Sequence, residues 1–224
     1  LLYCGLAAAI DVVVGVAIAY LMLRTRLPAR VSLDWIASAA LAVPGVVLAI
    51  GYLRLFRGVE MPLSDGELLT ATWVLIMIAY AIRRLPYALR SCVAALQQLH
   101  PALEEAAETL GATRARILRR IVVPLMAGGI LAGFVTSFIT AAVELSATIL
   151  LTTRESQAPM SYGIYLYLQS VSGRGPGAAL GVIAVAIVAL GTFASNWLLE
   201  RTRDDAAAGD AAVRTEPLAR PGAA

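Results

Sequence analysis

Five long apolar stretches constrain this chain more than any other feature of its sequence. A helix needs about 20 mostly apolar residues to cross a bilayer, and each stretch approaches or meets that length. Of the 224 residues, 59% are hydrophobic and 15% charged, whereas soluble domains carry about 25% charged residues. We therefore expect an all-α fold, a polytopic transmembrane helical bundle, rather than a water-soluble globule. The expected spans are residues 1–23, 33–53, 66–84, 125–151 and 177–199.

The distribution of arginine predicts how these spans are oriented. The third span is the weakest, because Arg83 and Arg84 cut it short unless it begins near Gly66 or both side chains snorkel. When it is counted and the 24–32 connection is taken as cytoplasmic, fourteen of the 18 basic residues lie inside. Since cytoplasmic loops carry an excess of positive charge, the C-terminus is expected to be cytoplasmic.

The two ends of the chain differ in character from the spans. Residues 204–224 are rich in Ala, Asp, Pro and Gly and show no apolar period, which predicts a disordered cytoplasmic tail. The chain begins within an apolar run, without a starting Met or a basic signal-peptide region. We therefore expect a fragment of a longer protein, with at least one helix upstream.

Residue types that are rare or absent exclude several functions. All 18 basic residues are arginine, so a Walker A phosphate loop or a Schiff-base lysine is excluded, and any nucleotide must be bound by another chain. One His and two Cys are too few for a His/Cys metal site or a disulfide framework. The net charge of +3, confined to short segments, favours membrane orientation over nucleic-acid binding. We expect no catalytic residue, cofactor or resident metal.

The stretch 100–124 is too polar to insert into a membrane and too regular to be a plain loop. Pro101 begins a predicted short helix whose first turn carries Glu104 and Glu105, where the helix dipole favours carboxylates. Gly111 supplies its C-terminal stop. The apolar stripe of this helix consists of Leu103, Ala106, Ala107 and Leu110, at helical spacing.

A second short helix follows a Thr113 cap and ends at Pro124. Its apolar side consists of Ile117, Leu118 and Ile121, and its other side of Arg114, Arg116, Arg119 and Arg120. Such a helix pair either lies on lipid headgroups or docks into a groove of a soluble partner. Ala106 and Ala107 favour docking, because small side chains let another backbone approach closely.

The same residues resemble the EAA loop of binding-protein-dependent ABC transporter permeases, the MetI-like family. Its pattern is Glu-Ala-Ala, three residues, Gly, nine residues, then Ile-x-Leu-Pro. Here Glu105, Ala106 and Ala107 are followed by Gly111 and then by the run 121–124, in which only Val123 departs, replacing Leu. More loosely, the runs 34–49 and 144–151 look like the C-terminal half of ferric-iron-type permeases.

The resemblance implies a transport subunit that is not itself an enzyme, in a bacterial cytoplasmic membrane. Its loop would form coupling helices that sit in a cleft of a cytoplasmic ATPase dimer, while an external solute-binding protein delivers the solute. A second permease half, fused upstream or supplied by a dimer partner, is also implied. Ferric iron is the expected solute, with thiamine, polyamine or sulfate as alternatives. The residues expected to couple to the ATPase are Glu105, Ala106, Ala107, Leu110, Gly111, Ile121 and Pro124.

Four residues inside the spans are candidates for a translocation path. Glu144 and Asp11 are ionisable groups within apolar segments, where such groups are costly and face a cavity or a partner. Each could instead be structural, hydrogen-bonded to a neighbouring helix. Pro44 and Gly45 interrupt the second span, which indicates either a broken helix lining a path or a packing kink.

Two other function classes remain open on the sequence. In an ion- or proton-coupled secondary transporter, Asp11 and Glu144 would bind the coupling ion and the 100–124 stretch would be a membrane-surface element. An intramembrane enzyme is the weaker alternative, since the chain has no G-x-S-x-G or H-E-x-x-H motif and a single His, His100.

Overall fold

The computed structural model describes residues 1–25, 30–62, 66–169 and 173–215. Within them the regular elements are helices, apart from one isolated β-bridge between Glu60 and Leu68, so the all-α prediction is confirmed. The long helices are α1 (Leu2–Arg24), α2 (Arg30–Ala42), α3 (Gly45–Leu55), α4 (Trp73–Gln97), α8 (Ala127–Ala142), α10 (Met160–Gln169) and α11 (Arg174–Thr215). The short ones are η1 (Leu69–Ala71), α5 (Ala102–Thr109), α6 (Arg114–Ile117), the π-helical turn η2 (Leu118–Val122), α7 (Val123–Leu125), α9 (Thr148–Leu151) and η3 (Glu155–Gln157).

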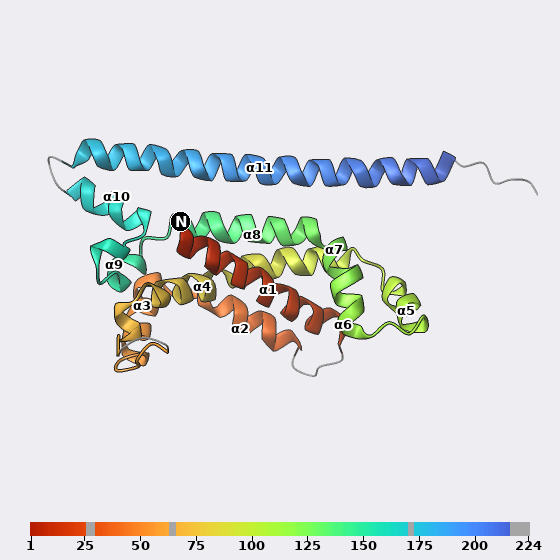
Figure 1. Cartoon of the computed structure of the whole chain (residues 1–224), viewed down its shortest axis with the longest axis horizontal. Coiled ribbons are helices and arrows are strands. Elements are labelled where there is room, and N and C mark those ends of the chain that lie inside the picture. The colour runs from red at the N-terminus through yellow and green to blue at the C-terminus, as the bar shows by residue number, and fades with distance from the viewer. Residues whose placement is uncertain (26–29, 63–65, 170–172, 216–224) are drawn as a thin grey trace, which may run out of the picture.

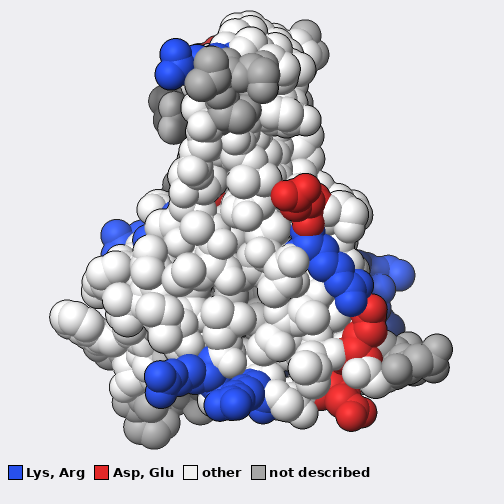
Figure 2. Space-filling view, turned by 90° about the vertical axis from the view of Figure 1, so that its left-hand side faces the viewer, with Lys and Arg blue, Asp and Glu red and all other residues white. Residues whose placement is uncertain are grey.

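Helices α1, α4 and α8 form the centre of the molecule and contact one another (Figure 1). Helices α5 and α6 lie at one end of this group, and α3 and α9 lie at the opposite end. Helix α11 runs along one side, where it contacts α8 and α10. Viewed from the α3, α9 and α10 end, the surface is mostly uncharged and its charged side chains gather in separate patches (Figure 2).

The central helices pack closely because α1 presents small side chains to its neighbours. Ala7, Ala8 and Ala19 are fully buried, and small residues allow helix backbones to approach each other in lipid. Two clusters of buried side chains result, one toward each end of the bundle. The first includes Leu75, Ile76, Tyr80 and Leu151, and the second includes Leu89, Leu96, Ile117, Val122 and Met126.

Two helices are long and apolar enough to cross a membrane unaided, Leu2–Arg24 and Arg174–Ala194. Two further spans are possible if each of two bent helix pairs crosses the membrane as a single span. These pairs are Ser32–Ala42 with Gly45–Leu55, bent by 105°, and Arg114–Leu125 with Ala127–Ala142, bent by 71°. The stretch 33–53, expected as one span, is thus two helices with a sharp break at Pro44. The break has a local cause, because proline lacks the N–H of a continuing helix and disfavours helical backbone in the residue before it.

Other elements also differ from the expected boundaries. The stretch 66–84 corresponds to α4, which begins only at Trp73 but continues through Arg83 and Arg84 to Gln97. The stretch 125–151 becomes α8 and α9, separated by residues 143–147. Helix α10 has no counterpart among the expected spans. Residues 204–215, expected to be disordered, continue α11, and the rest of the expected tail lies outside the described residues.

Candidate functional site

The predicted coupling loop is built as two short helices joined by a tight turn. Helix α5 begins after Pro101 and carries Glu104 and Glu105 in its first turn, as expected. It ends at Gly111, whose φ of 81° is costly for a residue with a Cβ. The Gly111 N–H donates to the Glu108 carbonyl at 2.9 Å and the Ala112 N–H to the Ala107 carbonyl at 3.0 Å. These two bonds form a Schellman motif, which stops α5 and turns the chain toward α6.

One face of this loop is exposed, and the other is anchored in the protein. The Leu110 side chain is 89% exposed, and Leu103 is 49% exposed. On the other side, Ala107 and Ile121 pack against the buried cluster of Ile117 and Val122. The expected apolar stripe of α5 is therefore split, with Ala107 turned inward. The remaining predicted coupling residues Glu105, Ala106, Gly111 and Pro124 are exposed.

A contact that the sequence did not indicate ties α5 to α1. The Arg24 Nε lies 2.5 Å from Glu104 Oε1, and both side chains are largely buried. The Tyr20 hydroxyl donates to the other Glu104 oxygen at 3.2 Å. Arg24 also donates to the carbonyls of Leu99 at 2.8 Å and Leu96 at 3.3 Å. One guanidinium thus joins the C-terminal ends of α1 and α4 to the first turn of α5.

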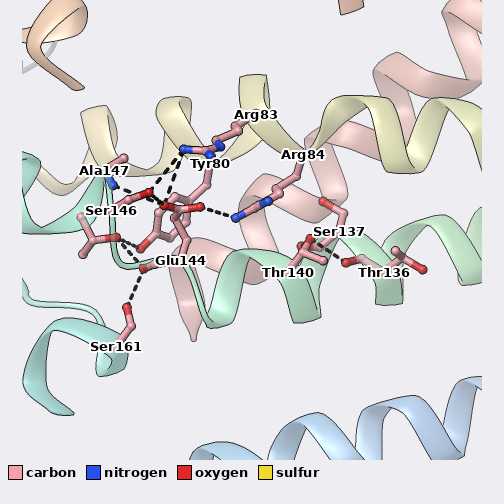
Figure 3. Close-up of polar contacts among 11 residues, drawn as sticks. Tyr80, Arg83, Arg84, Thr136, Ser137, Thr140, Glu144, Ser146, Ala147 and Ser161 are labelled. Atoms are coloured by element: carbon pink, nitrogen blue, oxygen red, sulfur yellow. Dashed lines mark hydrogen bonds and ion pairs between the residues drawn. The ribbon is translucent and has the colours of Figure 1, made fainter. Parts of the chain in front are cut away.

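The second candidate region is a buried polar cluster around Glu144 (Figure 3). Glu144 lies in the break between α8 and α9 and is 6% exposed. Arg84 Nη2 donates to one carboxylate oxygen, and Arg83 Nη1 lies 3.7 Å from the other. The Ser146 hydroxyl and the Ala147 N–H donate to that second oxygen, at 2.5 and 3.2 Å. A buried carboxylate is tolerated because it is paired and hydrogen-bonded.

The same cluster satisfies the backbone of the broken helix. The Glu144 carbonyl accepts hydrogen bonds from the hydroxyls of Thr148 and Ser161, both at 2.8 Å. The Tyr80 hydroxyl of α4 is 2.6 Å from Thr148 Oγ1. Helix interruptions at membrane depth require such partners, because lipid supplies none.

Gly45 brings the other helix break to the same place. A Cβ built on Gly45 would lie 2.0 Å from Arg83 Nη1 and 2.2 Å from Ser146 Oγ, so a side chain at this position would have to displace both of these polar atoms. Pro44 directly precedes it, at the start of α3. The two interruptions that the sequence indicated, at Pro44–Gly45 and at Glu144, therefore meet against Arg83 of α4.

Asp11 makes a different contact. It lies on α1, is 1% exposed and accepts a hydrogen bond from the Ser137 hydroxyl of α8. This bond is the structural alternative considered for Asp11, a link between two helices. Three of the four candidate path residues are brought together, and Asp11 is in a separate contact. Among the described residues, no three His, Cys, Asp or Glu side chains gather as a metal site.

Arg83 and Arg84, which were expected to cut the third span short unless it began near Gly66 or both side chains snorkelled, do not end the helix. Both lie in the middle of α4, and Arg84 is 8% exposed. The helix continues past them because Glu144 neutralises the buried charge. No local signal identified this partner, since Glu144 lies 60 residues from Arg84 in the sequence.

Comparison with known proteins places this architecture in context. The profile of the family described as "Binding-protein-dependent transport system inner membrane component" matches residues 11–204. The ferric transport system permease protein FbpB of Actinobacillus pleuropneumoniae is 28% identical over 203 residues, which cover 91% of this chain but 28% of that protein. This chain therefore spans little more than a quarter of the length of that relative.

Two other relatives are named for the transport of different solutes. The molybdenum transport system permease protein ModB of Escherichia coli K12 is 30% identical over 214 residues, covering 90% of this chain and 91% of that protein. The sulfate transport system permease protein CysT of Salmonella typhimurium is 32% identical over 154 residues, covering 66% of this chain and 55% of that protein.

Solved structures share the fold at low sequence identity. The MetNI methionine ABC transporter, in inward-facing conformations, has a chain with TM-score 0.66 and 18% identity, covering 89% of this chain and 90% of that one. A bacterial alginate ABC transporter, solved in complex with an alginate-bound periplasmic protein, has a TM-score of 0.67 at 18% identity, covering 89% of this chain and 75% of that one.

Proposed function

The chain belongs to the family of binding-protein-dependent transport system inner membrane components, and on that basis we propose that it is part of the membrane permease of an ATP-driven importer. In this role it binds no nucleotide and catalyses no reaction. A separate cytoplasmic ATPase dimer hydrolyses ATP, and an external solute-binding protein delivers the solute. Family membership favours this function over an ion-coupled secondary transporter.

The observation that carries the proposal is the exposed face of α5. Leu110 is 89% exposed at the tip of a helix that is stopped by Gly111 and anchored through Ala107 and Glu104. A large apolar side chain held in water by a rigid support is suited to a groove on a partner. We propose that this face, with Glu105 and Ala106, docks on the ATPase, and that Ile121 and Pro124 orient the helix that follows.

A charge placed on this face tests the proposal. Leu110→Glu is expected to abolish copurification of the ATPase and solute uptake while the permease itself remains folded. Leu68→Glu is the matched control, because Leu68 is 43% exposed at the other end of the molecule, beside the β-bridge to Glu60. Retention of both ATPase and uptake in Leu110→Glu would reject docking through α5.

The orientation in the membrane is part of the same proposal. The coupling loop 100–124 and the C-terminus are cytoplasmic, in the cytoplasmic membrane of a bacterium. Arg83 and Arg84 lie within α4 and are no longer counted as cytoplasmic charges. The excess of arginine on the cytoplasmic side remains without them. Two ATPase subunits require two coupling loops, so a second permease half, fused upstream or supplied by another chain, completes the importer.

For the solute we propose ferric iron first. The supporting observation is the match of 91% of this chain to a ferric permease. A molybdate or sulfate oxyanion is the second candidate, because the molybdenum permease is matched over 91% of its own length. The two are separated by uptake of labelled ferric iron, molybdate and sulfate in a strain lacking the intact gene. Loss of iron uptake alone supports the first candidate, and loss of oxyanion uptake with normal iron uptake rejects it.

In this importer the cluster of Glu144, Arg83 and Gly45 would border the translocation path. Its support is the meeting of two interrupted helices, because irregular backbone at membrane depth is tolerated where it is buried in protein or lines a cavity. Asp11 would act there only indirectly, through the packing of α1 on α8.

A further inference from the structure

A hollow of about 410 Å³ opens on the second helix of the loop 100–124, whereas Leu110 lies at the end of the first helix. The hollow is lined by Thr113, Ala115, Arg116, Arg119 and Arg120, of α6, its cap and the π-helical turn η2. Arg116 and Arg120 are four residues apart and Arg116 and Arg119 are three apart, which brings the three side chains to one face. The buried Ile117 and Val122 hold the other face of this segment against the core.

The positive charge of this hollow is not compensated by the described part of the protein. Arg116, Arg119 and Arg120 have no hydrogen bond or ion pair there. Of the three carboxylates in the loop, Glu104 pairs with Arg24 and Glu108 with Arg114, and Glu105 forms no ion pair with Arg116, Arg119 or Arg120. Three like charges on one helical face repel one another, and a bound anion would relieve this repulsion.

The position of the hollow indicates which anion fits. It lies where the arginine-rich segment meets an apolar helix, since Leu125 is 54% exposed and α8 follows directly. The pair formed by Arg114–Leu125 and Ala127–Ala142 is apolar enough to count as one bent span. Lipid headgroups lie where a lipid-facing apolar surface ends, and guanidinium groups bind phosphate through paired hydrogen bonds.

We propose that this hollow, formed by Arg116, Arg119 and Arg120, binds the phosphate of an anionic phospholipid headgroup of the cytoplasmic leaflet. The phosphate offsets part of the positive charge of the three arginines and holds α6 and η2 at the membrane surface. The three arginines belong to α6 and η2 and are not part of the exposed face of α5 that is proposed to dock on the ATPase. Lipid binding would make the stability of the loop depend on lipid composition.

The test measures lipid bound to the full-length permease in the absence of any ATPase. The protein is purified from membranes containing phosphatidylglycerol and phosphatidylethanolamine, and retained lipids are identified by native mass spectrometry. We expect retained phosphatidylglycerol, and a several-fold loss of it in R119Q/R120Q. The matched control is R54Q/R57Q, which removes two charges from a hollow of about 440 Å³ lined by Ile50, Leu53, Arg54 and Arg57 at the α3 end. This control is expected to retain the lipid.

Three results would overturn the proposal. Equal loss of phosphatidylglycerol in both variants would mean that any arginine pair recruits the lipid. Displacement of the lipid by inorganic phosphate at low concentration would assign the hollow to the free anion. Undiminished lipid in R119Q/R120Q would mean that the hollow does not bind the lipid. R119K/R120K, which keeps the charge but not the paired hydrogen bonds, is expected to retain an intermediate amount and controls for misfolding.

Discussion

Gly45 lies so close to Ser146 that a Cβ on residue 45 would stand 2.2 Å from the serine Oγ. These residues belong to two different interrupted segments, the start of α3 and the break between α8 and α9. Their contact fixes the position of one helix break against the other, and Arg83 of α4 completes the junction through Glu144. The stability of the bundle should therefore be sensitive to substitutions at this junction.

Gly45→Ala is expected to destabilise the protein by about 1–3 kcal/mol, because the new methyl group overlaps Arg83 and Ser146. Gly51→Ala is the matched control, since Gly51 lies in the same helix with nothing within 4 Å of its Cβ position. That change should be neutral or stabilising by about 0.5–1 kcal/mol, as expected for alanine in a helix. Both cysteines are buried, so thermal unfolding can be followed with a thiol-reactive dye. Equal melting temperatures for the two variants would contradict the close junction.

Glu144→Gln should be more severe, because it leaves Arg83 and Arg84 buried without a negative partner. Removing one member of a buried ion pair costs about 3–5 kcal/mol. Glu67→Gln, which weakens the exposed ion pair with Arg154, should cost about 0–1 kcal/mol. The measurement is again the melting temperature, together with the yield of monodisperse protein. A Glu144→Gln variant as stable as Glu67→Gln would show that the cluster contributes nothing to the fold.

Arg24 and Glu104 should be energetically coupled, because their side chains are buried and joined at 2.5 Å. In a double-mutant cycle of R24Q and E104Q on stability we expect an interaction energy of about 1–3 kcal/mol. The exposed pair Glu108 and Arg114, 3.6 Å apart in the same loop, should give about 0.2–1 kcal/mol. Additive effects of R24Q and E104Q would mean that α1 and α5 are held together by other contacts.

Gly111→Ala and Gly58→Ala should have similar effects on local stability but different effects on transport. Both glycines have positive φ, 81° and 76°, and a Cβ in that conformation costs about 1–2 kcal/mol. Only Gly111 lies in the coupling loop. We therefore expect solute uptake to fall several-fold in Gly111→Ala and to stay near normal in Gly58→Ala. Equal loss of uptake in both would mean that strain alone, irrespective of position, disables the protein.

Local signals predicted the elements that depend on local rules. Pro44 and Gly45 indicated a helix break, and the structure bends there by 105°. Gly111 indicated the end of a short helix, and it adopts the expected positive φ. The continuation of α4 through Arg83 and Arg84 depends instead on a contact with a distant residue. A hydropathy pattern treats Arg83 and Arg84 as charges that must reach water, and it contains no information about a carboxylate on another helix.

By itself, the sequence determined the all-α class, the position of the two-helix loop 100–124 and the sites at which helices are interrupted, because composition, periodicity and backbone sterics act over a few residues. Only the tertiary structure decided which charges are paired. Arg24 and Glu104 are 80 residues apart, and Arg84 and Glu144 are 60 apart. A buried charge is stable only beside its partner, and the partner depends on which helices pack together, which no local pattern records.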